Sequence, residues 1–567
     1  MGPKGPGPGA KRPEINELWA LLNSSRERYH ISMIKTKNNI SVVVLFSILF
    51  PLISSPGAYA QSNAYSALAS GARNIDMPTP EVPPAAFASI GGEKSASRES
   101  LRIIKMSNQE LAAASLDQRL QMLKTLVRDS HPNNNNSDSN DWDQKDVEEA
   151  ILRVLDSAPD AAAFDYMYYR IGKDSLQYSV GWYKDIVERV KKHRQSAVPG
   201  DWDAMAKYVD TVSQSAHSGR NMIKFLIDGK DVMAEAKVAL ASAQKSIHIE
   251  VFQLQADQIG QGLAQLLAAK VKAGVTVRLM IDEHGSKVDD DRALVNMLDG
   301  MRANGIQIIV KKPPFLKKHL DHRKVVVIDG KIGFTGGMNI GSLYQIEWHD
   351  QQTLIEGPAV AKLQEAFVER WKAAKGTIGA DEDLFPAIEE YADGAKTQVI
   401  QHIGLRDQNI KAMYLRAIAT SEKSINIANP YFTDEDIVDA LRVASRRGVK
   451  VRLVLPQDND MAIVQHASRY YYPKLVRSGV QVYEYKGRMA HEKVAVFDGR
   501  LATFGSSNLD ARSLFNNDEL NLIVTDYRVA QDIELNLFEA DLPDCELMNN
   551  YDHGVLDHMA HMVNGML

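Results

Sequence analysis

Two histidines and two lysines in the second half of the chain have the types and spacing of a reaction centre. Each histidine lies two residues before a lysine, in the runs HRKVVVID and HEKVAVFD. Core packing accounts for matching apolar residues, but not for polar side chains that are duplicated in one register. Six pairs of residues share a separation of 169 positions: His322 and His491, Lys324 and Lys493, Asp329 and Asp498, Gly336 and Gly505, Asn339 and Asn508, Asp350 and Glu519.

These residue types suit chemistry at a phosphodiester. Lysine supplies a positive charge and asparagine two amide donors, and both groups bind the non-bridging oxygens of a phosphate. We expect four residues to do so: Lys324, Lys493, Asn339 and Asn508. Two imidazoles on opposite sides of the phosphorus allow one to attack while the other protonates the leaving alkoxide. The scheme requires no metal ion and no other cofactor, because lysine, asparagine and imidazolium meet the charge of the transition state.

Two classes of carboxylate accompany the histidines. Asp350 and Glu519 fit the role of accepting a hydrogen bond from the second ring nitrogen of a histidine, which fixes its tautomer and stabilises the imidazolium. Asp329 and Asp498 differ, since each is followed by glycine between two apolar runs, which is a signal for a hairpin turn. We therefore predict that Asp329 and Asp498 have mainly structural roles.

The runs HRKVVVID with GGMN, and HEKVAVFD with GSSN, resemble the paired H-x-K-x4-D motifs of the phospholipase D superfamily. The resemblance covers residues 221 to about 538 and is strongest to the bacterial cardiolipin synthase branch. It implies a phosphohistidine intermediate, with His322 as the nucleophile and His491 as the acid. The symmetry of the two motifs does not by itself distinguish these roles.

The elements that must position these residues also repeat. SAQKSIHIEVFQ (242–253) matches SEKSINIANPYF (421–432), and KAGVTVRLMID (272–282) matches RRGVKVRLVLP (446–456). Apolar strands alternate with helices in both halves, which is typical of an α/β architecture. We predict two pseudo-symmetric α/β lobes, residues 221–395 and 396–567, with one shared active site, preceded by a small all-α domain.

The first part of the chain has a different character. Residues 33–60 contain two lysines, an apolar run of 14 residues from Ile40 to Ile53, and the sequence AYA before Gln61, which is the layout of a secretory signal peptide. Upstream residues 1–32 are interpreted as an extension or added residues. A linker is expected at 61–98, and helical periodicity predicts a helical domain at 99–220.

The signal peptide predicts a secreted or periplasmic protein that associates peripherally with membranes. This predicted location differs from that of bacterial cardiolipin synthases, which are usually membrane-bound or act at the cytoplasmic face. It leaves a secreted phospholipase D as an alternative to cardiolipin synthesis, and the sequence does not distinguish a hydrolase from a transferase.

The amino-acid composition limits the classes of protein and of substrate that remain possible. With 44% hydrophobic and 24% charged residues, the chain is globular, and its single cysteine, Cys545, forms no intrachain disulfide or cysteine-based zinc site. A phospholipid at a membrane surface is the expected substrate. A metal-independent endonuclease of the same superfamily is the alternative, but the net charge of −6 makes nucleic acid an unlikely partner. Protein partners are not predicted.

Overall fold

The computed structural model describes residues 34–36, 39–41, 93–129, 144–159, 163–164, 167–168, 198–213, 218–312, 319–404 and 407–562. The chain divides into two compact units, Met1–Met77 and Pro78–Leu567.

In the first unit, β1 (Ile34–Thr36) and β2 (Asn39–Ser41) form an antiparallel pair. The rest of the expected signal peptide (33–60), the upstream residues 1–32 and the expected linker up to residue 92 lie outside the described residues.

The second unit contains one mixed sheet of 15 strands. Its first-lobe strands are β3 (Arg220–Ile227), β4 (Ser246–Val251), β5 (Thr276–Asp282), β6 (Gln307–Lys311), β7 (Lys324–Ile328), β8 (Ile332–Gly336) and β9 (Gln351–Glu356). Its second-lobe strands are β10 (Ala395–His402), β11 (Ser424–Ala428), β12 (Lys450–Pro456), β13 (Gln481–Tyr485), β14 (Val494–Phe497), β15 (Leu501–Gly505), β16 (Glu519–Thr525) and β17 (Cys545–Leu547).

The strand order confirms the predicted pseudo-symmetric pair of α/β lobes. The first lobe has the order β6-β5-β4-β7-β8-β9-β3, and the second has the equivalent order β13-β12-β11-β14-β15-β16-β10, with β17 added at its edge. The lobes join where β3 and β10 pair antiparallel, through Asn221 with Ala395 and Arg220 with Lys396. The sheet is therefore continuous from one lobe to the other.

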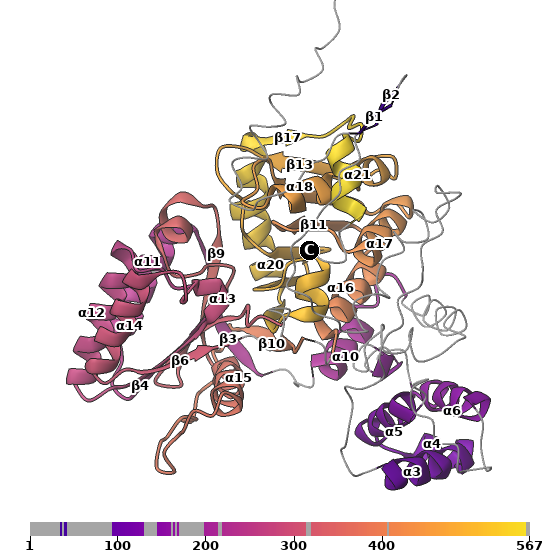
Figure 1. The fold of residues 1–567 in the computed structure, drawn as a ribbon, viewed down its shortest axis with the longest axis horizontal. Helices are drawn as coiled ribbons and strands as arrows, with labels where there is room; N and C mark the ends of the chain where they lie inside the picture. The colour runs from indigo at the N-terminus through magenta and orange to yellow at the C-terminus, as the bar shows by residue number, and fades with distance from the viewer. Residues whose placement is uncertain are drawn as a thin grey trace, which may run out of the picture. The chain divides into compact units, whose positions relative to one another are not determined.

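Helices cover the sheet on both faces (Figure 1). In the first lobe they are α11 (Asp228–Ser242), α12 (Gln258–Lys272), α13 (Glu283–Ser286), α14 (Arg292–Ala303), η2 (Leu343–Glu347) and α15 (Ala359–Ala373). In the second lobe they are α16 (Asn409–Thr420), α17 (Glu435–Arg446), α18 (Ala462–Arg469), α19 (Tyr472–Val476), η3 (Arg512–Asn516), α20 (Tyr527–Ile533), η4 (Glu534–Glu539), η5 (Leu542–Asp544) and α21 (Val555–Met562).

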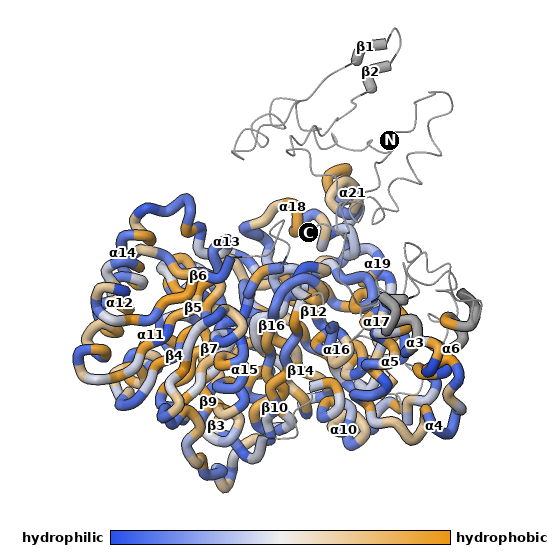
Figure 2. Tube along the Cα trace, turned by 60° about the horizontal axis from the view of Figure 1, so that its bottom comes forward, coloured by the Kyte–Doolittle hydropathy of each residue, from blue (hydrophilic) through white to orange (hydrophobic). Residues whose placement is uncertain are grey.

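Successive side chains of β7 pack against helices on opposite faces of the sheet. Val325 and Val327 pack in the apolar cluster that includes Leu363 of α15, whereas Val326 packs against the cluster that includes Val232 of α11. Successive side chains of a strand point to opposite faces, so β7, which is covered on both sides, is apolar from Val325 to Ile328. Figure 2 shows the corresponding hydrophobic colouring of the central strands.

The expected helical domain at 99–220 is described in part. Its helices are α3 (Glu93–Lys105), α4 (Asn108–Ala113), α5 (Leu116–Asp129), α6 (Gln144–Asp156) and α10 (Trp202–Ser213). The first four contact one another, whereas α10 packs on α16 and β10 of the second lobe. Tyr208 of α10 is buried there, and its hydroxyl donates to the carbonyl of Ala412, 3.3 Å away. The last helix before the lobes is thus built into the second lobe.

None of the helices in the described part of the chain is long and apolar enough to cross a bilayer.

Candidate active site

The two H-x-K segments lie at the start of equivalent strands. His322 precedes β7, which begins at Lys324, and His491 precedes β14, which begins one residue after Lys493. Each lysine turns back toward its own motif: Lys324 Nζ donates to the His322 carbonyl oxygen at 2.6 Å, and Lys493 Nζ to that of His491 at 2.5 Å. Both lysines and both histidines are buried.

Backbone contacts cross between the lobes at the site. The His322 amide donates to the carbonyl of Asp518 at 3.0 Å, and the His491 amide donates to the carbonyl of His349 at 2.7 Å. Asp518 and His349 each directly precede one of the candidate carboxylates. These two backbone hydrogen bonds therefore hold each histidine close to the candidate carboxylate of the opposite lobe.

The side chain of each candidate histidine also contacts a carboxylate of the opposite lobe. Nδ1 of His322 lies 2.9 Å and 3.1 Å from the two carboxylate oxygens of Glu519, and Nδ1 of His491 lies 2.7 Å from Oδ2 of Asp350. With Nδ1 engaged, Nε2 is the ring nitrogen left for chemistry at phosphorus. The ammonium nitrogen of Lys493 lies 3.0 Å from Nε2 of His491.

The two asparagines follow β8 and β15 and are buried. Oδ1 of Asn339 accepts from the backbone amide of Gln253 at 3.1 Å, which fixes the orientation of its amide group. In the described part of the chain, Oδ1 of Asn508 is buried without a hydrogen-bond partner. An unsatisfied buried amide at this position is consistent with a site that is completed by a ligand.

Burial shapes the charges of the lysines and of Asp350. It lowers the pKa of Lys324 to about 7 and that of Lys493 to about 8, and it raises the pKa of Asp350 to about 7. An anion bound between the lysines would favour their charged forms.

Glu519 behaves differently from Asp350. Burial acts to raise the pKa of Glu519, but the charges of His322 and Lys324 outweigh it and lower this pKa below its ordinary value. Ser506 also contributes, because its hydroxyl donates to Glu519 Oε2. Glu519 is therefore the more firmly ionised of the two carboxylates.

The histidines themselves respond mainly to burial. It lowers the pKa of His322, against the opposing effect of Glu519. It lowers the pKa of His491 well below the ordinary value, and the charges of Lys493 and Lys324 act in the same direction. Both shifts favour the neutral imidazole in the free protein, and they do so more strongly at His491.

Three aromatic side chains form walls around the imidazoles, and the sequence analysis did not single them out. Phe252 packs edge-on against His322 with ring centroids 4.8 Å apart. Trp348 and Tyr344 lie against His491, with centroids 4.8 Å and 5.7 Å away. Such contacts restrict ring rotation and exclude water. No motif marked these positions, because only the folded chain brings them to the histidines.

Ser506 was also missed as a site residue. It occupies the position equivalent to Gly337, where a Cβ atom would lie 2.4 Å from Asp350 Oδ1. Glycine thus leaves room for Asp350 in one lobe, while serine supplies a donor to Glu519 in the other. The difference between GGMN and GSSN was the available signal.

Asp329 and Asp498 lie at the far ends of β7 and β14, away from the histidines. Each is in the left-handed region, with φ of 53° and 52°, and begins the turn to the next strand. The carboxylate of Asp329 accepts from the amides of Gln244, Lys245 and Ser246 at 2.7 to 2.9 Å. Asp498 accepts equivalently from three successive amides, those of residues 422 to 424.

One cluster among the described residues has the composition of a metal site. His349, Glu492 and Asp541 are buried and offer ligand atoms within 4.8 Å of one another. However, His349 bonds Asp228 through Nδ1 and Asp541 through Nε2. Burial acts to lower the pKa of His349, but Glu492 and the two aspartates raise it to about 12. Because carboxylates engage both ring nitrogens of His349, we interpret this cluster as a buried ion-pair network.

The chain is similar to known proteins. A family model described as cardiolipin synthase, PLD-like domain, matches residues 237–371 and 414–542. The probable cardiolipin synthase YwiE of Bacillus subtilis (strain 168) is 31% identical over 399 residues, which cover 66% of this chain and 79% of that protein. This chain belongs to the cardiolipin synthase branch of the phospholipase D superfamily. The resemblance expected from the paired motifs is confirmed.

Other relatives agree. A cardiolipin synthase of Halalkalibacterium halodurans is 36% identical over 53% of this chain and 61% of its own length. The crystal structure of phosphatidylserine synthase from Haemophilus influenzae Rd KW20 has a TM-score of 0.50 at 13% identity, over 64% of this chain and all of that one, and shows the fold alone. As a member of this branch with both motifs complete, the chain is a phospholipase D-type enzyme.

Proposed function

We propose that this protein transfers phosphatidyl groups between alcohols, through a phosphohistidine intermediate. The observation that carries the proposal is the pair of crossed His–carboxylate contacts with two buried lysines beside them. The relatives named cardiolipin synthases support a glycerophospholipid as the substrate.

In the first step, Nε2 of His322 attacks the phosphorus of the phospholipid. The bond from phosphorus to the headgroup oxygen breaks, and His491 gives its Nε2 proton to the departing alkoxide. In the second step, the hydroxyl of an acceptor gives its proton to His491 and attacks phosphorus. The N–P bond breaks, His322 is regenerated, and His491 is ready for the next cycle.

The surroundings of His322 support its role as the nucleophile. A phosphorylated imidazole that keeps its Nδ1 proton is cationic, and the ionised Glu519 bonded to Nδ1 stabilises that charge. His491 must be protonated when the headgroup leaves. The negative phosphodiester and Asp350 favour this protonation once substrate is bound, against the burial that keeps His491 neutral in the free protein.

Lysine and asparagine side chains supply the electrostatic part of the mechanism. Lys324 and Lys493 flank the histidines, so their ammonium groups meet the charge on the non-bridging oxygens. Asn339 and Asn508 add amide donors from the ends of β8 and β15.

Exposed apolar side chains near the site favour a lipid over a nucleic acid. Ile346 lies on η2, between Tyr344 and Trp348, which contact His491, and is 61% exposed. Met461 and Ile463 are 41% and 43% exposed and follow Asp460, whose charge acts to raise the pKa of the site lysine Lys493. Apolar residues beside a catalytic centre suit contact with a bilayer or micelle surface, whereas a nuclease would expose a basic groove there.

The test uses the full chain with phosphatidylglycerol micelles in the presence of a chelator, with lipid products identified by mass spectrometry. Cardiolipin and free glycerol are expected, and added glycerol should reverse the reaction. Phosphatidic acid as the main product would make the protein a hydrolase. Intact lipid, with cleavage of single-stranded or double-stranded DNA instead, would favour the endonuclease alternative. His322→Ala and His491→Ala serve as inactive controls.

We also propose that the protein is exported and acts peripherally at a membrane surface. The proposal depends on the sequence pattern that ends at Ala60. Mass spectrometry of the N-terminus of the protein isolated from a producing cell should show a mature chain that begins at Gln61. A mature chain that retains residues 33–60 would contradict it.

A further inference from the structure

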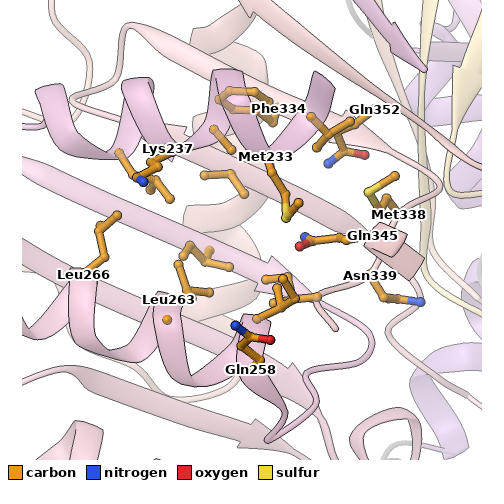
Figure 3. Close-up of a pocket in the computed structure, with 18 of the residues that line it drawn as sticks. Met233, Lys237, Gln258, Leu263, Leu266, Phe334, Met338, Asn339, Gln345 and Gln352 are labelled. Carbon is orange, nitrogen blue, oxygen red and sulfur yellow. The ribbon is translucent and has the colours of Figure 1, made fainter. Parts of the chain in front are cut away.

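A cavity of about 790 Å³ lies in the first lobe between α11, α12 and the sheet (Figure 3). Its volume is within the range of about 300–1,000 Å³ that is usual for small-molecule sites. Both helices present one side to it, because the lining positions on each recur at intervals of three and four residues.

The walls of the cavity are predominantly apolar. The two helices contribute aliphatic and methionine side chains, as does the sheet: Met233, Leu240, Leu263, Leu266, Val326 and Phe334. Polar groups are a minority of the lining: Figure 3 shows Lys237 and Gln258 near its ends and the amide of Gln345 directed into it. The apolar majority of the lining suits a hydrocarbon chain.

The cavity adjoins the candidate active site at Asn339. This residue lines the cavity together with Met338 and Ile340, and it is also one of the two site asparagines. The same loop leads to η2, whose exposed Ile346 lines the cavity as well. Asp257, which caps α12, accepts from the Ser342 amide and so ties the start of that helix to this loop.

We propose that this cavity binds one acyl chain of the phospholipid substrate while the phosphate lies between the two histidines. The inference rests on the proposed function and adds a binding site to it. The apolar lining supplies affinity in proportion to the methylene groups buried, about fourfold for each. The enzyme should therefore favour long-chain over short-chain phosphatidylglycerol beyond any effect of micelle formation.

Two glycines provide a matched pair of variants. A Cβ atom at Gly262 of α12, which lines the cavity, or at Gly300 of α14, which does not, would meet no atom within 4 Å. Gly262→Leu fills cavity space without a clash at Cβ, and Gly300→Leu makes the same change elsewhere. Leucine favours a helix more than glycine does, so neither variant should lose stability.

The first experiment compares kcat/KM for long-chain and dibutanoyl phosphatidylglycerol in both variants, with melting temperatures as a folding check. Gly262→Leu should lower the long-chain value at least tenfold and change the short-chain value less than twofold, while Gly300→Leu changes neither. Equal effects of Gly262→Leu on both lipids, or none on the long-chain lipid, would overturn the proposal.

A second measurement separates this inference from the proposed function, because it needs no turnover. Phosphatidylglycerol with a photoreactive group at the end of one acyl chain is cross-linked to the intact protein, and the labelled peptides are mapped. Labels are expected on α11 and α12, and should be lost in Gly262→Leu but not in Gly300→Leu. Labels elsewhere would exclude the cavity as the acyl site even in an active enzyme. Labels in the cavity of a protein without transferase activity would instead reject the proposed function alone.

Discussion

His322 of the first lobe and Glu519 of the second form a bidentate contact, in which one ring nitrogen lies 2.9 Å and 3.1 Å from the two carboxylate oxygens. Its symmetry mate, His491 with Asp350, crosses in the opposite direction. Each reacting imidazole is thus oriented by a carboxylate from the other lobe. The proposed mechanism therefore depends on the packing of the two lobes as well as on the residues within each motif.

Replacing Glu519 by Gln should lower kcat about 10³-fold, since the neutral amide cannot stabilise a cationic phosphohistidine and favours the wrong tautomer. KM should change little, because the fully buried Glu519 acts through His322 and not on the lipid directly. Steady-state kinetics with phosphatidylglycerol measure both. Glu546→Gln, at an exposed carboxylate paired with Lys486, is the matched control and should behave as wild type. A kcat within tenfold of wild type in Glu519→Gln would contradict the role of this carboxylate.

Ser506→Ala should have a smaller effect than Glu519→Gln. It removes one hydroxyl donor to Glu519 and leaves the carboxylate in place, so a loss of about tenfold in kcat is expected, as for a hydrogen bond to a charged group. The pH profile should also move. Without this donor the pKa of Glu519 rises, and activity should begin to fall at a higher pH when the solution is acidified. An unchanged acidic limb would argue that the serine only fills space.

The two histidines should differ in their dependence on the leaving group. In His491→Ala the general acid is missing, but a substrate with a nitrophenol leaving group needs no protonation, so phosphoenzyme should still form in a rapid burst. His322→Ala should give no burst with any substrate. Quenched-flow measurement with an alkaline quench, which preserves the acid-labile N–P bond of a phosphohistidine, distinguishes the two variants. The reverse pattern would assign His491 as the nucleophile.

Anion binding at the site should weaken as pH rises. The pKa of Lys324 is lowered to about 7 and that of Lys493 to about 8, so their ammonium forms are present below these values and are lost above them. Sulfate keeps a constant charge in this range, and its affinity should fall about tenfold per pH unit for each lysine that must be protonated. Calorimetry in buffers of different ionisation enthalpy should show proton uptake near pH 8.

The matched variants for this measurement are Lys493→Met and Lys486→Met. The first removes a buried site lysine and should bind sulfate more weakly with less proton uptake. The second removes an exposed lysine outside the site and should match wild type. Sulfate affinity that is independent of pH in the wild-type protein would show that the lysines remain charged throughout.

Asp329→Ala should affect stability and not catalysis. It removes a carboxylate that accepts from three backbone amides and places alanine at a φ of 53°. The free energy of unfolding should fall by about 2–3 kcal/mol, from the lost hydrogen bonds and the left-handed backbone. Chemical denaturation measures it, with kcat of the folded protein as the second readout. Asp329→Asn retains an acceptor and tolerates this conformation, so it should lose less. A loss of kcat without a loss of stability would move Asp329 into the catalytic machinery.

The sequence predicted the fold class because both of its signals are local. Apolar residues recur along each strand, and a duplicated chain repeats that pattern, as in β4 (SIHIEV) and β11 (SINIA), where isoleucine returns at every second position. The candidate residues were likewise visible from their shared register. Which carboxylate serves which histidine was not predicted, since the contact of His322 with Glu519 spans 197 positions and arises only when two lobes pack. The aromatic walls were missed for the same reason: Trp348 meets His491 through tertiary packing alone.

The continuity of the sheet through β3 and β10 was also beyond the sequence. It depends on the two residue pairs that join β3 and β10, and the sequence pattern of neither strand indicates which strand it pairs with. The docking of α10 on α16 is similar. The apolar residues on one side of α10, Met205, Tyr208, Val209 and Val212, predict a packed helix. They do not indicate that its partner is α16.

The crossed contacts have a consequence for synthesis of the chain. His322 leaves the ribosome long before Glu519, so a nascent first lobe carries a complete H-x-K motif without the carboxylate that orients its imidazole. Asp350 is likewise synthesised before its partner His491. A truncated or half-made polypeptide therefore lacks both crossed contacts, and the proposed centre is completed only after translation has passed residue 519.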